Sequence, residues 1–279
     1  METIYKIMDF LLPFECFDLK LMKHALLAIL LLTPLLSLFG TMAVNRRMAF
    51  FSDALGHSAL AGVGLGMLLG VQNELISMII FGILWAILIS RINRTGGASA
   101  DTIISVFSST GIAVGLLLLS RNGGFSQYSA LLAGDVLSIL PSDLGWLSLA
   151  LPIGILLWAW LYNRLLITAV NPALAQSRGV KTKWVEYAFV SLVALAVMLS
   201  IRWVGVLLIN ALLILPAAAG RNISRSAAQH ALFSVIIGLI SGVGGLVAAY
   251  YLNTGVGAAV VLCAAVCYAV TLPFRSRIK

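Results

Sequence analysis

Residues 50–60, FFSDALGHSAL, place an aspartate and a histidine four positions apart at the beginning of a long apolar run. Residues at positions i and i+4 lie on one face of an α-helix, with Cβ atoms roughly 6 Å apart. Asp53 and His57 could therefore contact one cation together. What the pair does depends on whether its helix lies in water or in lipid, and the composition of the chain answers that question.

The composition is that of an integral membrane protein. Of the 279 residues, 61% are hydrophobic and 10% are charged, and the mean hydropathy is +1.05. A soluble domain carries about 25% charged residues, so this chain lacks the polar side chains to cover a water-facing surface. Because a bilayer crossing needs roughly 20 apolar residues, we expect an all-α, polytopic transmembrane helix bundle that forms one domain over residues 1–279.

Nine apolar ranges are candidate membrane spans, which predicts about eight or nine crossings. They cover residues 22–44, 52–70, 74–92, 101–120, 142–163, 185–201, 203–220, 229–251 and 255–273. Cytoplasmic loops are enriched in Lys and Arg, and most of the 18 Lys and Arg residues lie in inner segments if the N-terminus is outside. We therefore expect an extracytoplasmic segment at 1–20 and a cytoplasmic C-terminus. The basic residues are dispersed between the apolar runs, which is typical of topology signals and not of nucleic-acid binding.

Two regions fit simple crossings poorly. Residues 121–144 are too polar to face lipid, and we expect a short re-entrant element there on the outer side, shielded by other helices. Its Asp135 and Asp143 could attract cations or a docking protein, or could be solvated loop charges. In the inner loop 165–184, Asn171-Pro172 predicts the start of a short helix and Gly179 its end. Such a helix at the cytoplasmic surface suggests a docking partner.

An imidazole and a carboxylate together suit Zn²⁺, Mn²⁺ or Fe²⁺ better than Ca²⁺ or Mg²⁺. Asp53 and His57 supply too few ligands for a closed structural site, so we expect the pair to belong to a site that an ion enters and leaves. The alternative is that Asp53 caps the start of its helix and His57 is a hydrogen-bonded packing residue. Both interpretations stay open on spacing alone.

Other polar residues inside the apolar ranges are weaker candidates. Asn210 suits an interhelical hydrogen bond or a place in a transport pathway. Ser109 is a further pathway candidate, together with Ser105, Ser108 and Thr110 in the same range, although hydroxyl side chains in helices also bond back to their own backbone.

The chain lacks the motifs of common enzymes and nucleotide-binding proteins. It has no G-x-x-x-x-G-K-[S/T] phosphate loop, no H-E-x-x-H pair and no G-x-S-x-G elbow. We therefore expect a protein that is not an enzyme, holds no permanent cofactor and does not bind ATP through a phosphate loop of its own.

Four ordered segments resemble the permease subunits of the ABC-type zinc, manganese and iron importers. They are RRMAFFSDALGHSALAGVGLG (46–66), LLAGDVLSILPSDL (131–144), NPALAQSRGV (171–180) and VGVLLINALLILPAAAGR (204–221). Their order and spacing, with the apolar runs between them, extend the resemblance over most of the chain.

The resemblance implies an assembly in a bacterial cytoplasmic membrane. Two permease copies would form one path that works by alternating access, two ATPase subunits would bind on the cytoplasmic side, and an extracytoplasmic binding protein would deliver the metal. Asp53 and His57 match the family's aspartate and histidine that are proposed to contact the ion in transit. The family's ATPase-coupling segment matches the inner loop 165–184, through Asn171, Pro172, Leu174, Ala175 and Gly179.

The resemblance also bears on the metal. Manganese-type members often read HxxLPG after the histidine, whereas this chain reads HSALAG, with Ala61 in place of the proline. That difference favours zinc, with manganese or iron as alternatives of the same type. A different class, an ATP-independent secondary carrier, would need more buried acids as coupling sites than this chain offers.

Overall fold

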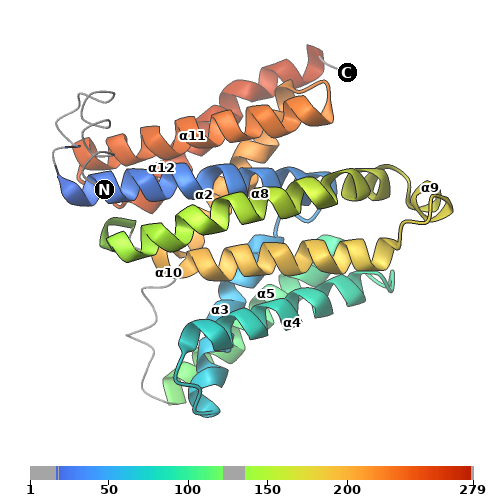
Figure 1. The fold of residues 1–279 in the computed structure, drawn as a ribbon, viewed down its shortest axis with the longest axis horizontal. Coiled ribbons are helices and arrows are strands. Elements are labelled where there is room, and N and C mark those ends of the chain that lie inside the picture. The colour runs from blue at the N-terminus through green and yellow to red at the C-terminus, as the bar shows by residue number, and fades with distance from the viewer. Residues whose placement is uncertain (1–16, 18, 122–135, 278–279) are drawn as a thin grey trace.

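The computed structural model describes residue 17 and residues 19–121 and 136–277, and every regular element in these ranges is helical (Figure 1). The all-α polytopic bundle predicted from composition is confirmed. Almost all of the predicted extracytoplasmic segment 1–20 and most of the predicted re-entrant element 121–144 lie outside the described residues.

The first half of the bundle consists of four helices close to the ranges predicted for them. They are α2 (Lys20–Asn45), α3 (Phe51–Leu68), α4 (Glu74–Asn93) and α5 (Ala100–Arg121). After the 3₁₀ turn η2 (Val136–Ser138) come α8 (Pro141–Val170), the short α9 (Pro172–Ser177), α10 (Thr182–Ile223), α11 (Ala227–Leu252), α12 (Val256–Thr271) and the 3₁₀ segment η3 (Leu272–Arg277).

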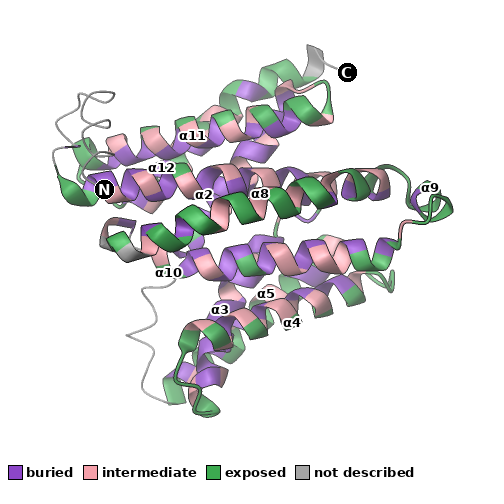
Figure 2. Ribbon diagram, in the orientation of Figure 1, coloured by how far each residue is buried: buried purple, intermediate pink, exposed green. Residues whose placement is uncertain are grey.

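Burial separates the central helices from those that face outward (Figure 2). Seven described helices are long and apolar enough to cross a membrane, namely α2, α4, α5, α8, α10, α11 and α12. The apolar windows of α2 and α10 are 67% buried, whereas those of α4, α5, α8 and α12 are 22–28% buried. Helices that are apolar on their exposed side fit a lipid environment. The number of crossings stays a prediction.

The long helix α10 is two helical segments joined at Gly205, whose φ of 74° and ψ of 165° are not helical. Near its start, Glu186 lies 4.0 Å from Arg46, which directly follows α2. Near its end, Arg221 donates to the carbonyl oxygen of Val44, also at the end of α2. Both ends of α10 therefore lie beside the same end of α2, so the chain reverses direction near Gly205. The two segments correspond to the predicted ranges 185–201 and 203–220.

We expect Gly205→Ala to destabilise the bundle. The φ and ψ of Gly205 lie in a region that essentially only glycine occupies, and a side chain there costs about 1–3 kcal/mol. Gly244→Ala is the matched control, because it lies within α11 and a Cβ there would meet nothing within 4 Å. Thermal unfolding in mild detergent should show a lower midpoint for Gly205→Ala only. Equal midpoints for the two variants would contradict the proposed reversal.

Small residues allow the helices around α3 to approach closely, as their spacing predicts. A Cβ added at Gly62 would lie 3.0 Å from the Cα of Met78 in α4, and one at Gly111 would lie 3.2 Å from the Cα of Ser58. The contact at Gly111 brings α5 against α3 and so positions the polar cluster described next.

Candidate metal-transit site

Asp53 and His57 lie on the least enclosed stripe of an otherwise buried helix. Most of α3 is buried in the bundle, but the side chain of Asp53 is 41% exposed and that of His57 is 28% exposed. On a helix whose other faces are packed, this partly open stripe is where a ligand or a second chain can reach.

The carboxylate of Asp53 joins three helices. Its Oδ1 lies 3.5 Å from Nε2 of His57 on α3 and accepts a hydrogen bond of 2.9 Å from Nδ2 of Asn210 on α10. Its Oδ2 accepts a longer bond of 3.4 Å from Oγ of Ser108 on α5. The Asp53 carboxylate thus links α3, α5 and the second segment of α10.

The alternative interpretation of Asp53 as a helix cap is wrong. Phe50 occupies the N-cap position of α3, and no side-chain capping bond is formed there. Asp53 lies in the first turn, where a negative charge is favourable next to the helix dipole, but its carboxylate bonds to other helices.

Two atoms beside the carboxylate are buried without a hydrogen-bond partner among the described residues. They are Nδ1 of His57 and Oδ1 of Asn210. Buried polar atoms are almost always satisfied, so unpaired ones need an explanation such as a ligand. A carboxylate oxygen, an imidazole nitrogen and an amide oxygen together form a mixed N/O donor set. No group of three or more His, Cys, Asp or Glu residues gathers anywhere in the described ranges, so the site is sparse and open.

Of the hydroxyl residues considered in the range 101–120, the structure places Ser108 beside Asp53. The predicted Ser109 is exposed on α5. Among the described residues, it forms no hydrogen bond to this cluster. The glycines could have indicated the correct serine, because Ser108 lies three positions before Gly111 and so on the face of α5 that packs against α3. Asn210, which was predicted, forms an interhelical hydrogen bond to Asp53; its pathway role stays a prediction.

The two outer acids do not join this cluster in the described residues. Asp143 lies in the first turn of α8, where its Oδ2 accepts a hydrogen bond of 3.1 Å from the backbone N–H of Leu140. It therefore acts as a helix-start cap. Asp135 lies outside the described residues.

The predicted docking helix exists as α9. Oδ1 of Asn171 accepts from the backbone N–H of Leu174 at 3.1 Å and caps the helix, and Pro172 occupies its first position. The chain leaves the helix through Gly179, whose φ is 77°. Ala175 is buried, whereas Leu174 keeps 46% of its surface exposed. The predicted start and end are confirmed, and the coupling role stays a prediction.

A buried ionic cluster lies at the start of α10, and it includes Arg46, one of the basic residues that the sequence analysis interpreted as topology signals. Glu186, at the start of α10, accepts from Ser90 at 2.8 Å and from Arg94 at 2.9 Å, both near the end of α4. It also lies 4.0 Å from Arg46 in the loop that leads into α3. The Arg46 side chain is 9% exposed and lies over the Phe189 ring at 5.8 Å. Burial lowers the pKa of the Arg46 guanidinium, and the Glu186 carboxylate partly opposes that shift.

Membrane-length helices pack around α3, which carries the acid and the histidine. Ionisable groups inside such a bundle mark the pathway of a substrate or an ion in many membrane transport proteins. The sequence model of the ABC 3 transport family matches residues 18–275, and the chain belongs to this family. It is accordingly a transport permease and not an enzyme.

Characterised relatives extend over nearly the whole chain. The high-affinity zinc uptake system membrane protein ZnuB of Haemophilus influenzae is 32% identical, over 93% of this chain and 99% of that protein. The manganese import system permease protein ScaB of Streptococcus parasanguinis is 31% identical, over 90% of this chain and 89% of that protein. The solved structure of PsaBC from Streptococcus pneumoniae in complex with Fab is 26% identical, with a TM-score of 0.81, and the match covers 100% of this chain and 99% of that chain.

Proposed function

We propose that this chain is the permease subunit of an ATP-driven importer of divalent transition metal ions, with zinc as the first candidate. The observation that carries the proposal is the Asp53–His57 pair, joined to Asn210 across helices and partly open, in a chain of the ABC 3 transport family. An ion would meet the carboxylate and the imidazole as transient ligands.

The small number of ligands is part of the proposed mechanism. Zinc sites that hold their metal permanently are closed, with four protein ligands, whereas a site with fewer ligands keeps positions open. Asn210 and Ser108 hold the Asp53 carboxylate by hydrogen bonds. On metal arrival that carboxylate would exchange a hydrogen bond for a metal bond, and the exchange would reverse when the ion leaves. Because the exchange involves α3, α5 and α10 together, occupancy of the site would be communicated to all three helices.

The choice of zinc rests on the sequence around the histidine. Ala61 in HSALAG stands where manganese-type members often have proline. The zinc and manganese relatives are 32% and 31% identical, so overall similarity does not separate them. An imidazole nitrogen suits zinc well, and manganese and iron remain alternatives of the same type.

We further propose a homodimer in which the open stripe of each copy lines a shared path. The exposure of Asp53 on a single copy supports this arrangement, as does the row of incompletely buried residues Leu207, Asn210 and Ile214 on the second segment of α10. ATPase subunits would bind at α9, and an extracytoplasmic protein would deliver the ion at the opposite end. The membrane is proposed to be the bacterial cytoplasmic membrane, with the N-terminus outside and the C-terminus inside.

Uptake into vesicles tests this function against a secondary carrier. Acids in the described helices lie only near their first turns, at Asp53, Glu74, Asp101, Asp143 and Glu186, which leaves few groups for proton coupling. We expect zinc uptake by vesicles that contain permease, ATPase and binding protein, only with ATP, and slower uptake of manganese. Uptake driven by a proton gradient in vesicles with the permease alone would contradict an ATP-driven importer.

We expect Leu174→Asp to weaken ATPase binding. Leu174 is an exposed apolar residue on α9, and a charge in the core of an interface is disfavoured. The matched control is Leu69→Asp, the same change at another exposed leucine, which directly follows α3. Co-purification with the ATPase should fall about tenfold for Leu174→Asp and stay unchanged for Leu69→Asp, because loss of a central apolar contact costs more than about 1 kcal/mol. Unchanged co-purification of both variants would remove α9 from the docking surface.

A further inference from the structure

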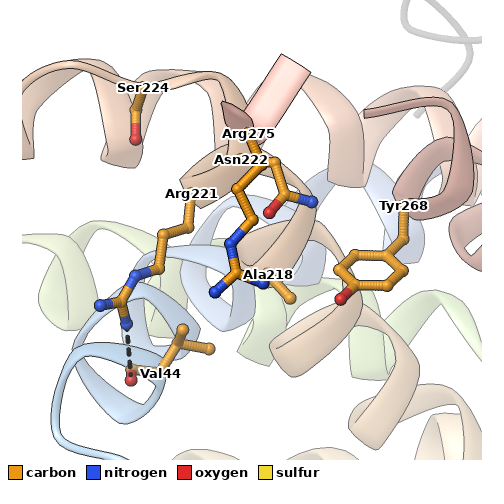
Figure 3. Close-up of a pocket in the computed structure, with 7 residues that line it drawn as sticks. All are labelled: Val44, Ala218, Arg221, Asn222, Ser224, Tyr268 and Arg275. Atoms are coloured by element: carbon orange, nitrogen blue, oxygen red, sulfur yellow. Dashed lines mark hydrogen bonds between the residues drawn. The ribbon is translucent and has the colours of Figure 1, made fainter. Parts of the chain in front are cut away.

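A cavity of about 480 Å³ opens where the ends of α2, α10 and α12 converge with η3 (Figure 3). Its lining consists of Val44, Ala218, Arg221, Asn222, Ser224, Tyr268 and Arg275. The cavity lies at the end of the bundle that also holds Arg46 and Arg94. It is separate from the cluster around Asp53, and the proposed transport mechanism does not use it.

Positive charge borders the cavity. Two guanidinium groups, those of Arg221 and Arg275, belong to its lining, and no Asp or Glu does so among the residues that the structure describes. Within the described ranges, neither arginine forms an ion pair. Arg221 donates one bond of 3.2 Å to the carbonyl oxygen of Val44, which fixes the side chain and leaves its other N–H donors for a ligand.

The remaining polar lining suits an oxyanion. Figure 3 shows the Arg275 guanidinium and the Tyr268 hydroxyl directed into the cavity, and Ser224 adds a second hydroxyl. Asn222 is 6% exposed, and its Nδ2 donates to Oγ1 of Thr271 at 3.2 Å, so the wall behind the arginines is fixed. Guanidinium forks and hydroxyl donors around one space match the geometry of a phosphate group.

The segment of chain that leads up to Arg275, one of the lining residues, exposes apolar side chains. Val270, Leu272 and Phe274, which lead up to Arg275, are 62%, 41% and 47% exposed. A soluble anion would gain nothing from these side chains, whereas the acyl chains of a phospholipid would cover them. Basic pockets between transmembrane helices are known to bind anionic headgroups.

We propose that this cavity binds the phosphate group of an anionic phospholipid, with Arg221 and Arg275 as the charged contacts and Tyr268 as a hydroxyl donor. A lipid bound there would join the ends of α2, α10 and α12. Its binding would not depend on which metal the chain transports.

The test uses the full-length chain in mild detergent and phosphate-free buffer. Thermal-shift titrations compare phosphatidylglycerol with phosphatidylcholine of the same acyl chains, and a parallel titration uses inorganic phosphate. We expect phosphatidylglycerol to bind more tightly than phosphatidylcholine. Arg275→Gln should weaken phosphatidylglycerol binding by about tenfold or more, since a hydrogen bond to a charged group is worth about 1.5–3 kcal/mol. Tyr268→Phe should weaken it by a smaller factor.

The control variant is Arg91→Gln, which removes the same charge from an exposed position in the last turn of α4, away from the cavity. It should bind phosphatidylglycerol as the wild type does. Equal affinities of Arg91→Gln and Arg275→Gln for phosphatidylglycerol would show that the lipid does not bind in this cavity. Arg275→Gln could instead weaken the binding of inorganic phosphate, while phosphatidylglycerol binds no more tightly than phosphatidylcholine. That result would show that the cavity binds free phosphate, and the proposed lipid would be wrong. If neither phosphate compound binds and Arg275→Gln instead loosens the ATPase, the cavity is a protein contact and the proposal is wrong.

Discussion

His57→Ala is expected to abolish ATP-driven metal uptake while the protein remains in the membrane in normal amounts. His57 supplies the imidazole of the Asp53 cluster, and its Nδ1 has no hydrogen-bond partner among the described residues. Loss of residues that merely support metal ligands costs 10–100-fold, so loss of a direct ligand should reduce uptake by at least about a hundredfold. Asp53→Asn should have a comparable effect, because it removes the charge but keeps the side-chain shape.

Two neighbouring serines provide the matched control. Ser108→Ala removes the bond of 3.4 Å to Asp53 and should slow uptake several-fold, whereas Ser109→Ala removes an exposed hydroxyl and should leave uptake unchanged. Radioactive zinc uptake, normalised to the amount of permease in the membrane, measures both effects. Normal uptake by His57→Ala would remove the histidine from the transport path.

Glu186→Ala is expected to cause the largest loss of stability. Its carboxylate is 13% exposed and is the shared partner of Ser90, Arg94 and Arg46. Removing one member of a buried ion pair leaves an uncompensated charge and costs about 3–5 kcal/mol. Thermal unfolding of the purified chain should show a clearly lower midpoint.

A double variant separates the lost charge balance from the lost packing. Glu186→Leu combined with Arg46→Met replaces both charged groups by apolar ones of similar size, and such replacements are often close to neutral. The double variant should therefore be more stable than Glu186→Ala. A double variant as unstable as the single one would mean that the Arg46–Glu186 charge pair is not the source of the stability.

Local signals in the sequence predicted the helices well, because a bilayer crossing sets their length and hydropathy. The short helix α9 was predicted by its own residues, since Asn171-Pro172 and Gly179 act through local backbone geometry. The same local reasoning placed the boundary between two spans near Gly205, but it could not predict the conformation of that residue.

Local signals in the sequence could not predict contacts between distant parts of the chain. The spacing of Asp53 and His57 left the capping and metal interpretations equal, and the bonds from Asn210 and Ser108 on other helices showed where the carboxylate points. The cluster around Glu186 joins residues 92 and 96 positions apart. No periodicity in the sequence relates such residues, so the sequence could not connect Arg46 to Glu186.

The most direct measurement is an anomalous-scattering structure of the permease–ATPase complex crystallised with zinc. The proposed function predicts a zinc peak within bonding distance, roughly 2.0–2.2 Å, of the His57 imidazole and the Asp53 carboxylate, and its absence in crystals of His57→Ala. A zinc peak inside the bundle that contacts neither residue, or one that persists in His57→Ala, would contradict it.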